Sequence, residues 1–197
     1  ILISLPFVIF YLCKAHYMVQ HEEKYTEEKC YKVAQRCISI MMHNGRIETE
    51  SFGQEYLPKD GGYVMYSNHQ GKYDTLGIMH SHTKPCTIVM DAYRSKLPIV
   101  DTFIDLVRGR RLDKTDMRKQ MQTMMQISGE VKEGRRYIVF PEGGYDNNKN
   151  ELQDFMAGAF KCAKQAKVPI VPVAIYDSHL VFDFNSIRKV TTQVYFL

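Results

Sequence analysis

Short strand-like runs alternate along this chain with segments of helical pattern, and this alternation narrows the folds that the chain can adopt. The runs lie at residues 46–50, 63–66, 86–90, 137–140 and 168–175, and the helical patterns between them at residues 75–80, 97–107 and 115–133. Strands that alternate with helices predict an α/β fold, in which helices flank a mostly parallel sheet. Pro169 and Pro172 fall within the last run, and prolines are typical of an edge or irregular strand rather than a central one.

We expect one α/β domain preceded by a helical segment. The chain has 197 residues, of which 45% are hydrophobic, enough for one well-packed core and too few for two. Residues 1–45 are expected to form an N-terminal helical segment, and residues 46–197 the α/β domain. The sequence begins with Ile1 rather than methionine and ends inside an apolar run at residues 194–197, which indicates a piece of a slightly longer protein.

Residues 1–13 are nearly all apolar and are followed by Lys14. A membrane-spanning helix needs about 20 apolar residues. The stretch therefore favours either the remaining end of a spanning or signal-anchor helix, or an interfacial segment. The alternative is an N-terminal helix packed in the core of a soluble domain. A second helical pattern follows, with Thr26 as its N-cap and its end at Asn44 and Gly45.

Cysteine spacing and net charge exclude several classes of protein. The five cysteines are odd in number, form no C-x-x-C pair and have no histidine-rich partner segment, so neither a disulfide framework nor a zinc site is predicted. A reducing, cytoplasmic setting fits best. The formal net charge of +4 is a mild bias toward anionic partners, such as phospholipid head groups or the phosphates of coenzyme A. Without a recognition motif, nucleic acid is not an expected partner.

Residues 67–74 directly follow the strand-like run 63–66 and contain His69 and Asp74. The carboxyl ends of strands are where α/β folds place their ligands and their chemistry. The two side chains can meet if the turn brings the start of the next helix back toward the strand, and Gly71 eases such a turn. A carboxylate bonded to one imidazole nitrogen leaves the other free to take a proton from a hydroxyl. This predicts a base with an orienting acid; the alternative is an ordinary histidine in a surface turn.

Three short blocks carry a resemblance to a known family. They are Asn68, His69 and Asp74; Phe-Pro-Glu-Gly at residues 140–143; and Val-Pro-Ile-Val-Pro-Val at residues 168–173. In their order and spacing the chain resembles, over residues 49–175, the glycerolipid acyltransferase family, whose bacterial type member is 1-acylglycerol-3-phosphate O-acyltransferase. Three blocks in the right order are much stronger evidence than any one of them.

The resemblance implies transfer of a fatty acyl group from a thioester to the free hydroxyl of a lysophospholipid. The first candidate acceptor is 1-acylglycerol 3-phosphate, which would give phosphatidic acid in phospholipid biosynthesis. His69 would act as the base and Asp74 would orient it, and Asn68 is included among the substrate-binding residues. Glu142 would hydrogen-bond the acceptor's hydroxyls or anchor its loop, and Gly143 would let backbone N–H groups approach a phosphate or the developing oxyanion.

The implied partners are a phospholipid membrane, a lysophospholipid acceptor and a thioester donor, either acyl-CoA or acyl carrier protein. The expected location is the cytoplasmic face of the cell membrane. No metal and no cofactor is expected, and no covalent acyl-enzyme, because no cysteine or serine stands in a nucleophile's place within the matched blocks.

A basic cluster at residues 108–119 contains the family's second block, where an Asp-Arg pair helps to hold the acceptor phosphate. This chain has Asp113 and Lys114 there. Lysine keeps the positive charge but lacks the bidentate fork of arginine. Arg111 is the candidate to take the place of the family's arginine. The alternative is a solvated charged face.

Three further positions depart from the family pattern. Gly144 and Tyr145 stand where the family has Thr or Ser followed by Arg, and Met156 stands where it commonly has Lys. These departures leave alternatives open. One is the same chemistry on glycerol 3-phosphate, another lysophospholipid or an amino-acid lipid. The others are a lipid-binding membrane protein without catalysis and a hydrolase that uses the dyad to activate water.

Overall fold

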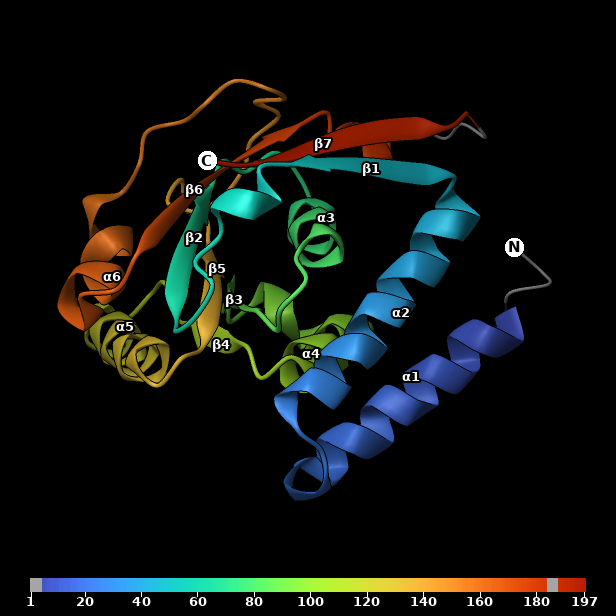
Figure 1. The fold of residues 1–197 in the computed structure, drawn as a ribbon, viewed down its shortest axis with the longest axis horizontal. Coiled ribbons are helices and arrows are strands. Elements are labelled where there is room, and N and C mark those ends of the chain that lie inside the picture. Colours follow the sequence, from blue (N-terminus) through green and yellow to red (C-terminus); the bar gives the residue numbers. More distant parts are fainter. Residues whose placement is uncertain (1–4, 184–187) are drawn as a thin grey trace.

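The fold is an α/β sandwich built around one twisted sheet (Figure 1). The structure, a computed structural model, describes residues 5–183 and 188–197. Within these residues the sheet has seven strands in the order β1-β7-β6-β2-β5-β3-β4. The strands are β1 (Ile47–Phe52), β2 (Tyr63–Ser67), β3 (Thr87–Asp91), β4 (Arg110–Leu112), β5 (Arg136–Val139), β6 (Ile170–Tyr176) and β7 (Val190–Phe196). All neighbours are parallel except β6 and β7. The predicted fold class is therefore confirmed.

Helices cover both faces of the central strands. The described helices are α1 (Leu5–Gln20), α2 (Glu27–Gly45), α3 (Asp74–Ser81), α4 (Pro98–Leu106), α5 (Met117–Lys132), α6 (Lys161–Ala166) and α7 (Leu180–Asp183). Side chains alternate across β2: Val64 and Tyr66 pack toward α5 and α6, whereas Tyr63 and Met65 belong to the core shared with α1 to α4. Figure 1 shows α5 and α6 on one side of β2 and β5, with α3 and α4 on the other. A strand buried on both faces explains the continuous apolar run at residues 63–66.

The two N-terminal helices pack against each other and contribute to the same core as the sheet. Ala15 and Met18 of α1 are buried beside Ala34 and Ile38 of α2. Thr26 caps α2, because its hydroxyl oxygen accepts the N–H of Lys29 at 3.4 Å. Among the described residues, no helix combines the length and the apolar character needed to cross a bilayer. Residues 1–4, part of the apolar stretch predicted to meet the membrane, lie outside the described residues.

Of the two alternatives predicted for the proline-containing strand, the edge position was wrong. β6 lies inside the sheet, between β7 and β2. Its first half pairs with β2, and its pairing with β7 begins only at Val173. The carbonyl of Pro172 faces β7 and accepts the N–H of Leu197 at 3.0 Å. The N–H that this proline lacks would point to the same side, where the pairing with β7 begins. The proline therefore removes no hydrogen bond to β2 and only the terminal bond of the ladder with β7, which is why an interior strand tolerates it.

Candidate active site

The strand-to-helix turn after β2 brings His69 and Asp74 together. Nδ1 of His69 lies 2.6 Å from Oδ2 of Asp74, the first residue of α3. The same oxygen accepts the backbone N–H groups of Gln70 at 2.6 Å and Gly71 at 3.0 Å. The other carboxylate oxygen accepts the hydroxyl of Ser178. Because Asp74 is fully buried and hydrogen-bonded through both carboxylate oxygens, the carboxylate is held in one orientation.

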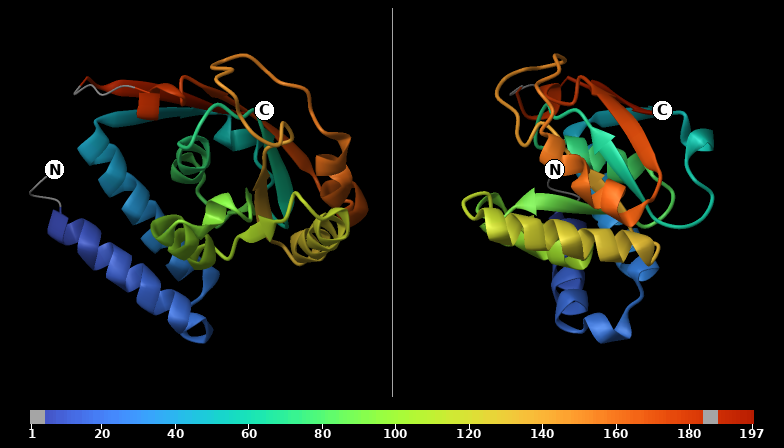
Figure 2. Two further views of the ribbon diagram at one scale, coloured as in Figure 1. Left: turned by 180° about the vertical axis from the view of Figure 1, so that it is seen from behind. Right: turned by 90° about the vertical axis from the view of Figure 1, so that its left-hand side faces the viewer.

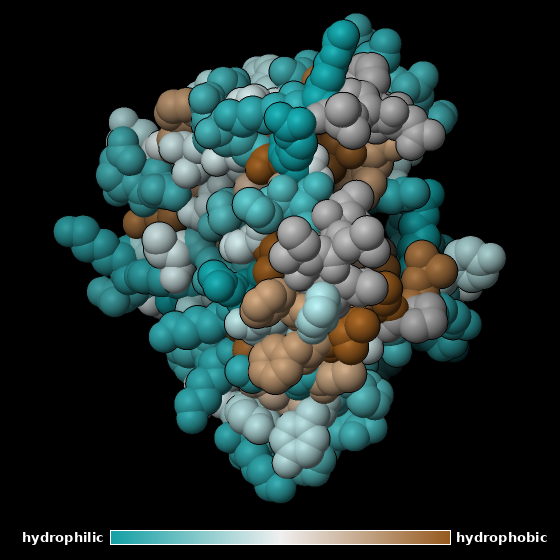
Figure 3. Space-filling view, turned by 90° about the vertical axis from the view of Figure 1, so that its right-hand side faces the viewer, coloured by the Kyte–Doolittle hydropathy of each residue, from teal (hydrophilic) through white to brown (hydrophobic). Residues whose placement is uncertain are grey.

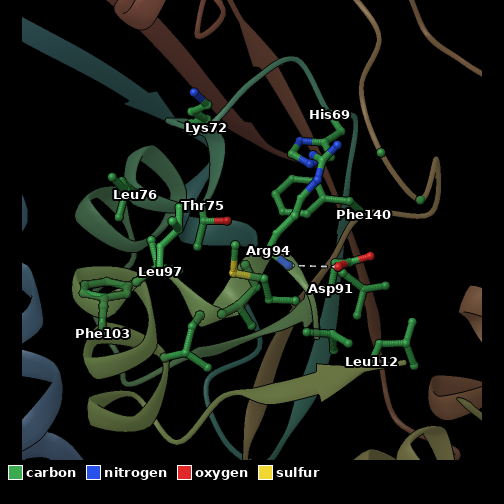
Figure 4. Close-up of a pocket in the computed structure, with 18 of the residues that line it drawn as sticks. His69, Lys72, Thr75, Leu76, Asp91, Arg94, Leu97, Phe103, Leu112 and Phe140 are labelled. Atoms are coloured by element: carbon green, nitrogen blue, oxygen red, sulfur yellow. Dashed lines mark hydrogen bonds between the residues drawn. The ribbon is translucent and has the colours of Figure 1, made fainter. Parts of the chain in front are cut away.

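Aromatic rings hold the imidazole of His69 on its other sides. The ring stacks on Phe140, with 4.1 Å between centroids and 16° between planes. Tyr145 meets it edge-on at 4.6 Å. The His69 side chain is 17% exposed, and it lines a large cavity (Figure 4). With Nδ1 bonded to the carboxylate, Nε2 is the nitrogen that can accept a proton from a molecule in this cavity.

Glu142 joins the loop after β5 to the loop after β2. One carboxylate oxygen accepts the backbone N–H of His69 at 3.2 Å, and the other accepts the side-chain amide of Gln153 at 3.1 Å. Burial raises the pKa of this carboxyl above its usual value. Of the two roles expected for Glu142, these contacts support the anchoring of the loop, and the residue also lines the cavity.

Gly143 makes the sharp turn that follows Glu142. Its φ of 72° lies in the left-handed region, and its N–H donates to the carbonyl of Phe140 at 3.1 Å. That N–H is therefore occupied within the turn. Its carbonyl accepts Nζ of Lys114 at 2.6 Å. Lys114 also pairs with Asp91 at 3.4 Å and thereby ties the loop to the end of β3.

Replacing Gly143 with alanine should lower the free energy of unfolding by about 1–2 kcal/mol, because the left-handed conformation disfavours any Cβ. The new Cβ would also lie 2.1 Å from Cε of Met156, so that side chain must move out of the cavity wall. Thermal unfolding of the purified variant measures the loss. The matched control is Gly144→Ala, since a Cβ there meets nothing within 4 Å. Equal effects at the two positions would contradict this account of the turn.

The cavity next to His69 has a volume of about 2180 Å³ and extends in two directions. One part lies among α1, α2, α3 and α4 and is mostly apolar. Its lining side chains include Tyr11, Leu12, Met41, Leu76, Val100 and Phe103. The other part passes the Glu142 loop and follows α5 and α6. His69 therefore has access to a space that can hold more than one long, flexible molecule.

Three side chains predicted to bind substrate lie elsewhere and do not line this cavity. The amide of Asn68 pairs with the backbone of Ile175, donating to its carbonyl at 2.9 Å and accepting its N–H at 2.7 Å, so it ties β2 to β6. Arg111 is held by Asp105 and Asp101, each at 2.6 Å, and these bonds raise its pKa. Asp113 accepts the hydroxyl of Thr115 at 2.6 Å. Each group already has partners within its own part of the fold.

The structure also adds residues that the sequence motifs did not indicate. Ser178 reaches Asp74 from the segment after β6, and Tyr145 lies against His69. The guanidinium carbon of Arg94 lies 5.6 Å from the ring centroid of Tyr145, and Figure 4 shows this side chain extending toward His69 and Phe140. Arg94 follows β3 directly, so only the rule that ligands gather at the carboxyl ends of strands could have indicated it.

The fold and the site together define an α/β protein with a His-Asp pair at the carboxyl edge of its sheet. The family model described as Acyltransferase matches residues 48–176, which include the pair, the Glu142 loop and most of the sheet. The chain therefore belongs to the Acyltransferase family.

Individual relatives agree with this assignment. The chain is 34% identical over 138 residues to human 1-acyl-sn-glycerol-3-phosphate acyltransferase beta, a match that covers 66% of this chain and 46% of that protein. It is 30% identical over 132 residues to the 1-acyl-sn-glycerol-3-phosphate acyltransferase of Saccharomyces cerevisiae, covering 66% and 43%. It is 28% identical over 147 residues to the putative 1-acyl-sn-glycerol-3-phosphate acyltransferase acl-1 of Caenorhabditis elegans, covering 74% and 55%. The chain thus spans about half the length of these relatives.

A solved structure shares the fold. The 1-acyl-sn-glycerophosphate (LPA) acyltransferase PlsC from Thermotoga maritima matches 95% of this chain and 75% of its own, with a TM-score of 0.67. The two chains are 20% identical, so this likeness concerns the fold alone.

Proposed function

We propose that this chain is the acyltransferase domain of an enzyme that transfers a fatty acyl group from a thioester to the hydroxyl of 1-acylglycerol 3-phosphate, giving phosphatidic acid. The observation that carries the proposal is the 2.6 Å contact between His69 and a buried Asp74, at the edge of a cavity able to hold two lipid-sized molecules. The names of the relatives support the choice of acceptor.

In this mechanism Asp74 accepts a hydrogen bond from the Nδ1–H of His69 and leaves Nε2 as the base. Nε2 takes the proton of the acceptor hydroxyl while the oxygen attacks the thioester carbonyl. The tetrahedral intermediate then collapses, the C–S bond breaks, and the imidazolium returns its proton to the departing thiolate. An ester forms, a thiol is released, and the dyad ends in its starting state.

Cations near His69 support an acceptor that carries a phosphate. Arg94 lines the cavity, and no acidic side chain among the described residues pairs with its guanidinium, which lies over Tyr145. Lys114 also lines the cavity, although part of its bonding capacity goes to Gly143 and Asp91. A guanidinium at this end of the cavity suits a phosphate, since its planar fork binds two phosphate oxygens at once.

Mass spectrometry of products from mixed acceptors tests the proposal. The mixture contains 1-acylglycerol 3-phosphate, glycerol 3-phosphate and other lysophospholipids, with acyl-CoA and acyl carrier protein thioesters as donors. Phosphatidic acid is the expected main product. A different acylated product would show that the acceptor is not 1-acylglycerol 3-phosphate. Free fatty acid without any acylated acceptor would indicate a hydrolase, and no thioester-dependent product would indicate a lipid-binding protein.

We further propose that α1 rests on the cytoplasmic face of a membrane, as the lipid substrates require. Phe7, Ile9 and Phe10 are each more than half exposed. Figure 3 views the side of the molecule where α1 begins and shows brown and tan side chains gathered below the centre of that face. Exposed aromatic and aliphatic side chains on one helix are typical of an interfacial segment.

The double variant Phe7→Ser, Phe10→Ser should bind anionic phospholipid vesicles about tenfold more weakly than the unchanged protein, because it loses apolar groups that enter the head-group region. Co-sedimentation with vesicles measures the change. Leu152→Ser is the control, since it removes an exposed apolar side chain from the loop after β5. Equal binding by the double variant and the unchanged protein would show that α1 is not the membrane contact.

A further inference from the structure

The cavity that contains His69 continues into a groove between α5 and α6. Figure 2 shows these two helices side by side on the face of the molecule away from α1. The lining of this part includes Met117, Gln120, Met121, Met124 and Met125 from α5, and Lys161, Lys164, Gln165 and Lys167 from α6 and the turn after it. We call this part the α5–α6 groove.

Methionine side chains form one wall of the groove. Met117, Met121 and Met125 follow one another at intervals of four residues, so they lie on one face of α5. They are 79%, 54% and 56% exposed. Met156 continues this surface toward the active site, because its Cε lies beside Gly143. Flexible thioether side chains in a row suit a thin, extended ligand rather than a bulky one.

Lysine side chains define the charge of the groove. Lys161, Lys164 and Lys167 are exposed, and no ion pair of theirs is found among the described residues. The acidic residues in the lining of the whole cavity, Asp91 and Glu142, both lie near His69. The groove is therefore apolar along α5 and positively charged along α6, and it opens at one end onto the catalytic base.

We propose that the α5–α6 groove binds the nucleotide end of a coenzyme A thioester. The thioester lies at His69, the pantetheine arm extends along the methionines, and the phosphates of the 3′-phospho-ADP group contact the three lysines. Coenzyme A has this order of parts: a reactive thioester, a long thin arm and a compact polyanion. Lysine ammonium groups bind such phosphates as point charges. The inference rests on the proposed function and specifies its donor.

The deciding variant is the triple substitution Lys161→Ala, Lys164→Ala, Lys167→Ala. The KM for acyl-CoA should rise about tenfold with kcat nearly unchanged, because the lysines contact the donor in the ground state and the transition state alike. With 3′-dephospho-acyl-CoA as donor, the unchanged protein and the variant should differ much less. The control is Lys29→Ala, Lys32→Ala, Lys132→Ala, which removes the same charge from exposed positions outside the cavity.

Binding of adenosine 3′,5′-bisphosphate provides a readout that does not depend on turnover. Calorimetry should detect binding to the unchanged protein and to the control, and at least tenfold weaker binding to the triple variant. Equal binding by all three, or an unchanged KM for acyl-CoA, would overturn the proposal while leaving acyl transfer in place. A defect confined to acyl carrier protein donors would reassign the groove to that protein. If no thioester is used at all, the proposed function fails. The bisphosphate measurement still decides whether the groove binds a nucleotide.

Discussion

Replacing His69 with alanine should lower the rate of acyl transfer by about a hundredfold to ten-thousandfold, the range that a positioned general base contributes. The fold should remain, because Asp74 keeps three other donors, Ser178 and the N–H groups of Gln70 and Gly71. Initial rates at saturating donor and acceptor measure the first effect, and thermal unfolding measures the second.

His43→Ala is the matched control for this variant. His43 is exposed near the end of α2 and does not line the cavity. The control should retain the full rate. A His69→Ala protein with an unchanged melting temperature and normal turnover would show that another group removes the hydroxyl proton, and the mechanism proposed above would have to be abandoned.

Asp74→Asn should lower the rate by about 10- to 1,000-fold while leaving the binding of both substrates unchanged. The amide oxygen can still accept the N–H groups of Gln70 and Gly71, so the loop keeps its shape. The imidazolium that forms during the reaction, however, loses the negative charge beside it, and a neighbouring opposite charge changes a proton equilibrium by one to three powers of ten. The new amide N–H group faces the hydroxyl of Ser178, which can accept from it and donate to Oε1 of Gln70, so little stability should be lost.

Ser178→Ala separates the two effects of this substitution. It removes one hydrogen bond from Asp74 and keeps the carboxylate charge and the bond to His69. Its rate should fall much less than that of Asp74→Asn. Equal rates for Asp74→Asn and the unchanged protein would show that the charge has no part in catalysis. Equal losses for Ser178→Ala and Asp74→Asn would show that orientation matters and charge does not.

The local parts of the fold were predictable because short-range physics determines them. Alternation of apolar runs with helical segments indicated the parallel sheet, and Thr26 marked the start of α2 through its capping oxygen. The strand-to-helix position of residues 67–74 indicated that His69 and Asp74 could meet, and they lie 2.6 Å apart. In each case the residues that decide the outcome are close together in the sequence.

Predictions that depended on distant neighbours were less successful. The interior position of β6 follows from the exact residue at which β7 begins to pair with it. Arg111 looked like a phosphate ligand, yet two acidic residues one turn apart on α4 hold its guanidinium. Asn68 belongs to the matched block, and its amide hydrogen-bonds the backbone of Ile175, a contact that no local pattern indicates.

The sequence by itself determined the α/β class of this protein, its family blocks and the histidine and aspartate of its candidate site, because strand and helix patterns and a five-residue turn depend on neighbouring residues. Only the tertiary structure decided that Ser178, Phe140 and Tyr145 enclose this pair and that the α5–α6 groove leads to it. Those contacts join residues far apart along the chain. They arise only when helices pack on both faces of the sheet and bring the loops at its carboxyl edge together.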